Sequence, residues 1–369
     1  MLKFHIFSFS AVEFPSSNDA SSLEVEQLRN DQSIDYVINR ILNSTTSYTE
    51  YKKLTNIDSV YDGHSSQTGE CECMDFWECM INDGHVFSYC HGTNQVCCFK
   101  GADQLGILPR PSKISQCGQK GPDGLITGES AAGEFPWHTA LLEKPYDLYV
   151  CGASLVDEHW VLTAAHCVDE FLDKATSLKV RLGEHDVSKL TERYRHEEFS
   201  VSKIILHHGF DNSTLLHDIA LVKLETSVKR RPHIDLICMP PVQLKVEKLL
   251  NTECYITGWG RKNEGSAHST VLKEVKVPVW RSNECQKALQ KLFGPNFRLP
   301  STNLCAGALG RDACDGDGGG PLVCRMEDNK WTQVGIVSFG IGCGRANIPG
   351  VYTKVDQYTD WIHTTVLTN

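Results

Sequence analysis

The sequence predicts an all-β fold that ends in a helix and is preceded by a small disulfide-stapled module. Three observations support this prediction. From residue 117 onward, many short apolar runs such as WVLTAAH and TQVGIVSF are separated by turn residues, which is typical of a β-barrel or sandwich. Residues 358–367 have the pattern of a closing helix. The sixteen cysteines fall into a compact group and a dispersed group.

The cysteines indicate disulfides and therefore an oxidising compartment. Six lie within residues 71–98 and ten are spread over residues 117–343, and both counts are even, as full pairing requires. Zinc is the alternative. The C-x-C and C-C pairs of the compact group lack the usual ligand spacing, however, and no histidine pair completes a site. We therefore expect a secreted, extracellular protein.

The remaining global features agree with secretion only in part. The N-terminal stretch MLKFHIFSFSAVEF has one lysine and an interrupted apolar run, so it is a poor signal peptide. No later segment approaches the roughly 18 apolar residues of a membrane span. The formal net charge of -10 argues against a general nucleic-acid-binding role.

Composition divides the chain into four segments. Residues 1–70 form a polar, mostly flexible extension, and residues 71–98 form the cysteine-rich module. That module is too small to bury a sufficient core, so three disulfides of roughly 2–4 kcal/mol each would have to stabilise it. Residues 99–116 are a linker, and residues 117–369 form the large domain. Two glycosylation sequons begin at Asn43 and Asn212.

Three short motifs in the large domain carry candidate chemistry. LTAAHC contains His166, HDIALV contains Asp218, and GDGGGP contains Gly318. Their order matches the His, Asp and nucleophile positions of a chymotrypsin-type triad. Residues 117–369 therefore resemble the trypsin/chymotrypsin family. The resemblance implies two six-stranded β-barrels, a chymotrypsin-like double β-barrel, with the site in the cleft between them.

The departure from the family lies at the nucleophile, because relatives have serine where this chain has Gly318. Without a side-chain oxygen, His166 has nothing to deprotonate and no acyl-enzyme forms. Losing the serine costs about 10⁶ in turnover in a comparable protease. We therefore expect a non-catalytic protein. The alternative is an active protease whose recorded sequence carries an error at position 318, and a serine codon there would reveal it.

Activation is also altered relative to the family. Active relatives are cut after a basic residue, and the new N-terminus pairs with the Asp before the serine. Here Leu125 replaces the basic residue. We therefore expect Asp317 to lack its usual ammonium partner, the new N-terminus, and the oxyanion hole of the Gly316 and Gly318 amides to stay unformed. On this interpretation Gly318→Ser restores little activity unless Leu125→Arg is added and the chain is cut.

The resemblance also implies a specificity pocket. Asp312 matches the acidic base that selects Arg or Lys, and Gly340 and Gly350 match the pocket walls. One interpretation is inherited architecture without a ligand. The other is non-catalytic capture of a basic side chain.

A calcium loop is a further candidate, with Glu184, Asp186 and Glu197 as hard oxygen ligands. The alternative is a solvated acidic loop. The expected binding role requires no cofactor.

Resemblance also supplies the disulfide pairing. For the large domain it implies Cys117–Cys238, Cys151–Cys167, Cys254–Cys324, Cys285–Cys305 and Cys314–Cys343. The order C-x-C-x5-C-x10-C-x6-C-C in the small module resembles the clip domain of arthropod proteases and their homologues. For this module it implies Cys71–Cys97, Cys73–Cys90 and Cys79–Cys98, although sequence alone leaves all 15 pairings of six cysteines open.

The combination resembles the clip-domain serine protease homologues, similar to the prophenoloxidase-activating factor 2-type cofactors. The resemblance implies a haemolymph protein that binds prophenoloxidase or clip-domain proteases in melanisation and innate immunity. Residues 80–89 contain neither Arg nor Lys, so the clip cleavage site of many relatives is missing. An adhesion or developmental role is the alternative, and the sequence leaves oligomerisation open.

Overall fold

The computed structural model describes residues 12–13, 72–74, 85–89, 96–99, 117–124, 128–189 and 191–369. Contacts divide the chain into two compact units, one of residues 39–116 and one of residues 1–38 with 117–369. The sequon at Asn43 lies outside the described residues.

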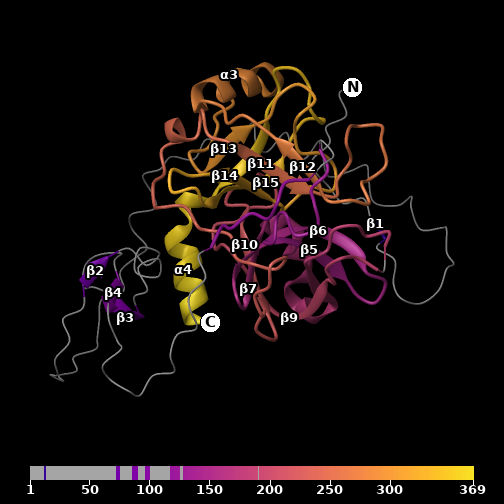
Figure 1. Cartoon of the computed structure of the whole chain (residues 1–369). Coiled ribbons are helices and arrows are strands. Elements are labelled where there is room, and N and C mark those ends of the chain that lie inside the picture. Colours follow the sequence, from indigo (N-terminus) through magenta and orange to yellow (C-terminus); the bar gives the residue numbers. More distant parts are fainter. Residues whose placement is uncertain are drawn as a thin grey trace. The chain divides into compact units, whose positions relative to one another are not determined.

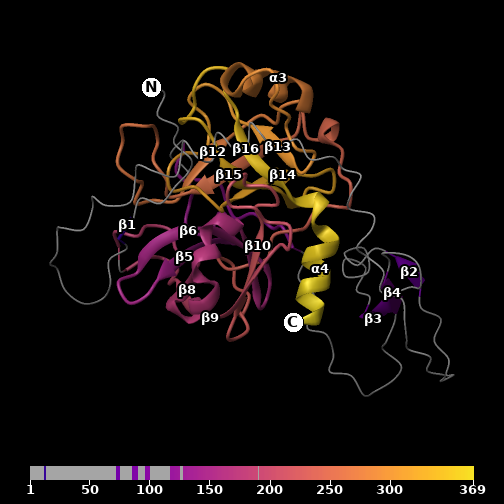
Figure 2. The same cartoon turned by 180° about the vertical axis from the view of Figure 1, so that it is seen from behind.

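The large unit contains two antiparallel sheets, one above the other in Figures 1 and 2. The first has seven strands in the order β1-β6-β5-β8-β9-β10-β7, and an additional β6–β7 pairing closes it into a barrel. Its edge strand β1 pairs with β6 and comes from the N-terminal segment that the sequence predicts to be mostly flexible. The strands are β1 (Val12–Glu13), β5 (His138–Glu143), β6 (Leu148–Asp157), β7 (Trp160–Thr163), β8 (Leu178–Leu182), β9 (Glu197–Leu206) and β10 (Ala220–Leu224).

The second sheet has six strands in the order β12-β11-β14-β15-β16-β13. The chain after β12 returns to β13 through a bridge between Val279 and Ala306, and the Trp280 amide donates to the Cys305 carbonyl at 2.8 Å. The predicted double barrel is thus confirmed. The strands are β11 (Cys254–Gly258), β12 (Lys273–Lys276), β13 (Asn303–Ala306), β14 (Pro321–Arg325), β15 (Trp331–Phe339) and β16 (Gly350–Lys354).

Apolar burial explains why these short runs become strands. In β7 all four residues are buried, and in β15 only the last residue is partly exposed. Such continuous burial matches the uninterrupted apolar runs of the sequence. The largest fully buried side chains include Trp137, Trp160 and Trp259.

Short helices follow or cover the barrels. The predicted closing helix is α4, which lies beside the first barrel in both views (Figures 1 and 2). At its start the Tyr358 hydroxyl is hydrogen-bonded to His217 Nδ1 at 3.0 Å, and the rings of Trp361 and His207 are 5.3 Å apart. The C-terminus therefore ties the second barrel to the first. The helices are η3 (Ala165–Cys167), η4 (Asp169–Ser177), η5 (Val246–Lys248), α3 (Ser282–Phe293), η6 (Val355–Gln357) and α4 (Thr359–Thr368).

Five disulfides staple the large unit, and all five pairings expected for it are confirmed. The bonds are Cys117–Cys238, Cys151–Cys167, Cys254–Cys324, Cys285–Cys305 and Cys314–Cys343.

The small unit contains a three-stranded antiparallel sheet in the order β2-β4-β3, namely β2 (Glu72–Met74), β4 (Val96–Phe99) and β3 (His85–Tyr89). Cys73 is disulfide-bonded. The other clip cysteine side chains lie outside the described residues, so the three clip pairings stay predictions.

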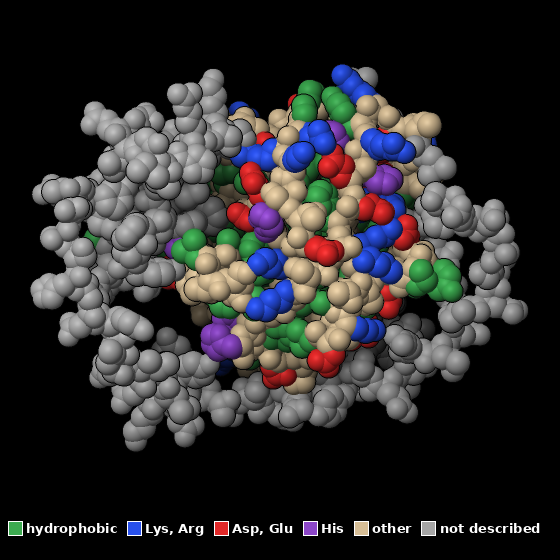
Figure 3. All heavy atoms as spheres, turned by 90° about the horizontal axis from the view of Figure 1, so that it is seen from below, with side chains coloured by type: hydrophobic (Ala, Val, Ile, Leu, Met, Phe, Trp, Pro, Cys, Tyr) green, Lys and Arg blue, Asp and Glu red, His purple; other side chains and the backbone are tan. Residues whose placement is uncertain are grey.

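The surface shows no segregation of charge on the face in Figure 3. Lys and Arg side chains there are interspersed with Asp and Glu. This mixture differs from the single-sign basic surface typical of nucleic-acid binding. In the described part of the chain, no helix is both long and apolar enough to cross a bilayer.

Candidate functional site

Two of the three predicted triad positions meet at the first barrel. His166 lies on η3, directly after β7, and Asp218 lies two residues before β10. Because β7 and β10 are paired, their ends bring the two side chains together. His166 Nδ1 lies 2.8 Å from Asp218 Oδ2, and the His166 amide donates to Asp218 Oδ1 at 2.9 Å.

The second barrel completes the surroundings of Asp218, whose side chain is fully buried. The Ser338 hydroxyl donates to Asp218 Oδ2 at 2.6 Å, and the Thr353 hydroxyl donates to the Asp218 carbonyl at 2.8 Å. Burial alone lowers the pKa of His166, but the charge and hydrogen bond of Asp218 outweigh it and raise that pKa above its usual value. The pair therefore has the electrostatics of a general base and its orienting carboxylate.

At the third triad position, Gly318 offers only backbone atoms. The Gly318 carbonyl accepts a hydrogen bond from the Gly152 amide at 2.9 Å, which anchors the loop before β14 to β6. Gly318 is not among the glycines with positive φ, whereas its neighbours Gly316 and Gly319 have φ of 90° and 73°. A side chain at position 318 is therefore compatible with the backbone. His166 Nε2 lies 3.6 Å from the sulfur of Cys167.

We predict that Asp218→Ala destabilises the fold by about 3–5 kcal/mol, even if the chain does no chemistry. The change leaves His166 without its buried partner and Ser338 without an acceptor. Denaturant unfolding with the disulfides intact measures the effect. The control is Glu253→Ala, which removes an exposed ion pair with Lys276 and is expected to cost less than about 1 kcal/mol. Equal effects of the two changes would contradict a structural role for the pair.

Asp317 has a cationic partner that was not predicted from the sequence and that is not a new N-terminus. Lys273 Nζ lies 3.2 Å from Asp317 Oδ2, and both side chains are only 5% exposed. Asp317 also accepts hydrogen bonds from the Gly260 amide at 2.8 Å and the Cys314 amide at 3.0 Å. The carboxylate is thus fully engaged without a new N-terminus. Leu125 itself lies outside the described residues.

The predicted oxyanion-hole positions are Gly316 and Gly318. Within the described ranges, the amides of Gly316 and Gly318 have no hydrogen-bond acceptor. Two free amides on consecutive sides of a held Asp317 are the donors that an oxyanion would need. The two amides are therefore available as donors, and the expected state of the oxyanion hole stays a prediction.

The predicted pocket base, Asp312, is partly buried. Its carboxylate accepts from the Ala313 amide at 2.9 Å and from the Gly344 amide at 3.4 Å. Burial raises the pKa of Asp312 to about 7, against the effect of these amides. Among the described residues, Asp312 has no Lys or Arg in ion-pair distance.

Two glycines let the backbone lie directly against this carboxylate. A Cβ on Gly350, the first residue of β16, would lie 2.8 Å from Asp312 Oδ1, and one on Gly307 would lie 3.0 Å from it. Gly340, the other predicted wall, is buried directly after β15. The structure therefore brings Asp312 and Gly350 together as predicted.

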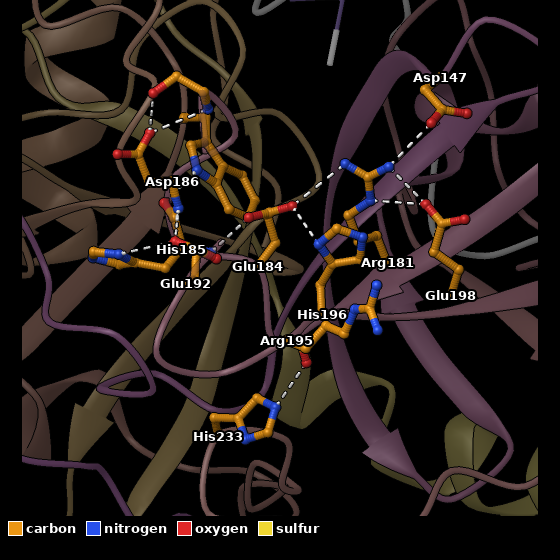
Figure 4. A network of polar contacts seen from close by, with 12 residues as sticks. Asp147, Arg181, Glu184, His185, Asp186, Glu192, Arg195, His196, Glu198 and His233 are labelled. Carbon is orange, nitrogen blue, oxygen red and sulfur yellow. Dashed lines mark hydrogen bonds and ion pairs between the residues drawn. The ribbon is translucent and has the colours of Figure 1, made fainter. Parts of the chain in front are cut away.

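Two of the three candidate calcium ligands, Glu184 and Asp186, lie in the network of polar contacts shown in Figure 4. Glu184 pairs with His196 at 3.0 Å and with Arg181 at 3.3 Å. Arg181 is 5% exposed and also contacts Asp147 at 3.0 Å and Glu198 at 2.6 Å. Burial raises the pKa of Glu184, but His196 and Arg181 more than offset this, so its pKa is lowered. The central cation of this network is thus a guanidinium.

The other two candidates are engaged elsewhere. Asp186 pairs with Lys189 at 2.5 Å and accepts from the Ser188 hydroxyl at 2.6 Å, and Glu197 pairs with Arg231. Because each carboxylate already has a cationic partner, Glu184, Asp186 and Glu197 do not fit a shared calcium ion.

The described residues contain a single group of converging metal-ligand side chains, Cys151, His166 and Cys167. Its two cysteines are joined in a disulfide and offer no thiolate.

Sequence reasoning missed two functional cations, Lys273 and Arg181. Each lies in or beside an apolar strand run, VLKEVKV and LKVRL. A charged residue inside such a run was the one available signal, since buried Lys and Arg nearly always have a partner.

Comparisons with known proteins agree with this geometry. Residues 126–362 match the Trypsin family. The chain is 36% identical over 245 residues to "Serine proteinase stubble" of Drosophila melanogaster, covering 64% of this chain and 30% of that protein. It is 38% identical over 276 residues to "Inactive CLIP domain-containing serine protease A3" of Aedes aegypti, covering 73% of this chain and 56% of that protein.

A third relative is matched over most of its length. "Phenoloxidase-activating factor 2" of Galleria mellonella is 37% identical over 281 residues, which cover 69% of this chain and 91% of that protein. The first two relatives are spanned for less than two thirds of their length. The family match, the double barrel and the His166–Asp218 pair together show that this chain belongs to the trypsin family, as a clip-domain serine protease homologue.

Proposed function

We propose that the protein is a secreted, non-catalytic protease homologue that binds a basic side chain of a partner protein without cleaving it. The observation that carries this proposal is Asp312, the predicted pocket base: its carboxylate is mostly buried, lies against Gly350 and has no cationic partner among the described residues. The pocket lies six residues along the chain from Gly318, which has no nucleophilic oxygen. On this proposal the protein still binds a basic side chain, but it forms no acyl-enzyme.

The pocket chemistry selects Lys or Arg. An ionised carboxylate at the base of a partly buried site binds a cation through charge-assisted hydrogen bonds. A side chain held there is not released by turnover, so the complex lasts as long as its dissociation rate allows. This behaviour suits a cofactor or regulator that holds a partner in place.

The partner is proposed to be prophenoloxidase or a clip-domain protease that activates it. Support comes from the Galleria relative, whose name is phenoloxidase-activating factor 2, and from the Aedes relative, whose name marks it as inactive. We therefore propose haemolymph as the place where this protein acts. Five disulfides in the large unit support an oxidising, extracellular environment.

Two experiments test these statements. In the first, purified protein should not hydrolyse Arg-amide substrates and should not be labelled by fluorophosphonates, which need a serine oxygen. Stoichiometric labelling would overturn the inactive assignment.

In the second experiment, prophenoloxidase and its activating protease are mixed with and without this protein, and phenoloxidase activity is followed. We expect a change in activity that Asp312→Asn and deletion of residues 71–98 each reduce. No change, together with no binding to either component, would favour an adhesion role.

The pocket should bind cations in a pH-dependent way. Because burial raises the pKa of Asp312 to about 7, protons compete with a cationic ligand below that pH. We expect the affinity for p-aminobenzamidine to be full above about pH 8 and to fall up to tenfold per pH unit below about pH 7. Fluorescence titration across this range measures it. Asp312→Asn serves as the control, with weak binding at every pH, and a flat wild-type profile would contradict the assignment.

A further inference from the structure

Lys273 occupies an unusual position for a lysine. It begins β12, is 4% exposed, and its ammonium donates to the Arg261 carbonyl at 3.0 Å as well as pairing with Asp317. A buried ammonium is costly unless it is paired and hydrogen-bonded, and Lys273 has both kinds of partner.

Asp317 in turn controls the backbone on either side of it. Its two oxygens are held by the Gly260 amide, the Cys314 amide and Lys273. The residues directly before and after it, Gly316 and Gly318, carry the two amides that lack an acceptor in the described structure. The orientation of these amides therefore depends on where the Asp317 side chain is fixed.

The segment that follows the activation position lies against Lys273. Glu129 forms an antiparallel bridge with Lys273, and the Ser130 amide donates to the Leu272 carbonyl at 2.9 Å. On the other side, the Gly124 amide donates to Glu134 Oε2 at 2.9 Å. These contacts exist in the uncut chain, with a cation already on Asp317.

We propose that Lys273 is the positioning residue of the Asp312 pocket: its ammonium fixes Asp317, and through it the pocket loop and its two free amides, without cleavage of the chain. The pocket is then ready to bind as soon as the protein is made. This also explains how a chain with Leu125 at the activation position keeps a formed site. The inference rests on the proposed function in so far as the pocket binds a cation.

The first test uses the uncut protein and p-aminobenzamidine. We expect Lys273→Met to weaken binding at least about tenfold, and Lys273→Arg to recover part of it because the charge is restored. The matched control is Lys276→Met on the same strand, which removes an exposed lysine paired with Glu253 and should leave binding unchanged. Should Lys273→Met fail to fold, Lys273→Met/Asp317→Asn leaves no unpaired buried charge and replaces it.

The second test does not depend on Asp312. In a Gly318→Ser background, labelling of the uncut chain by diisopropyl fluorophosphate requires the His166–Asp218 pair and the two amides, but no cation in the pocket. We expect labelling to slow at least about tenfold on adding Lys273→Met and to stay the same on adding Lys276→Met.

The outcomes separate the two proposals. Labelling that depends on Lys273, without amidine binding by the wild type, would refute the cation pocket and support the positioning role. If Lys273→Met changed neither amidine binding nor labelling, the positioning role would be overturned, whereas the cation pocket would stand. A Gly318→Ser chain that is labelled only after cleavage would also overturn it.

Discussion

Gly318→Ser should turn the uncut chain into a working protease, with Arg-amide hydrolysis rising at least about 10³-fold above the wild type. The new hydroxyl would give its proton to His166 Nε2, whose ring is oriented by Asp218 at 2.8 Å. Its oxygen would attack the scissile carbonyl, and the developing oxyanion would meet the amides of Gly316 and Gly318. The φ of position 318 admits a side chain.

Steady-state hydrolysis of an Arg-amide substrate before and after trypsin treatment measures this effect. Gly318→Ala is the control, because it adds a side chain without an oxygen. Gly318→Ser/His166→Ala should return the activity to background. If the single variant were as inactive as Gly318→Ala until Leu125→Arg was added and the chain cut, the Lys273–Asp317 ion pair would not replace the new N-terminus.

This expectation reverses what the sequence suggests, and the reason is physical. The activation motif is local, so the replacement of its basic residue by Leu125 is visible in sequence. The partner of Asp317 is not local: Lys273 lies 44 residues away and reaches it only once the second barrel has formed. The only sequence feature that could have indicated an ammonium in place of the new N-terminus is therefore a lysine within an apolar run.

The same contrast holds elsewhere in the site. The motifs around His166, Asp218 and Asp312 could be predicted from residue types at fixed spacing, and the five disulfides of the large unit from the family resemblance. The carboxylates of the acidic loop have the right chemistry for calcium, but in the structure Arg181 of β8 pairs with Glu184. Sequence gives the ligand types, whereas only the fold shows which cation reaches them.

Asp312→Asn should weaken binding of p-aminobenzamidine by about 30-fold to 5,000-fold, since removing one partner of a buried charge pair costs about 2–5 kcal/mol. The amide keeps the shape of the carboxylate but loses its charge. Gly350→Ala should weaken binding without changing charge, because its Cβ would lie 2.8 Å from Asp312 Oδ1. Both effects are measured by fluorescence titration above about pH 8, where Asp312 is ionised.

Two controls isolate the pocket charge. Asp328→Asn makes the same change in net charge at an exposed turn residue and should leave binding unaltered. Benzamide, the neutral analogue of benzamidine, should bind the wild type and Asp312→Asn equally weakly, because neither complex contains an ion pair. If Asp312→Asn bound the amidine as tightly as the wild type, the cation would be held elsewhere. The partner's basic side chain would then have to be sought outside this pocket.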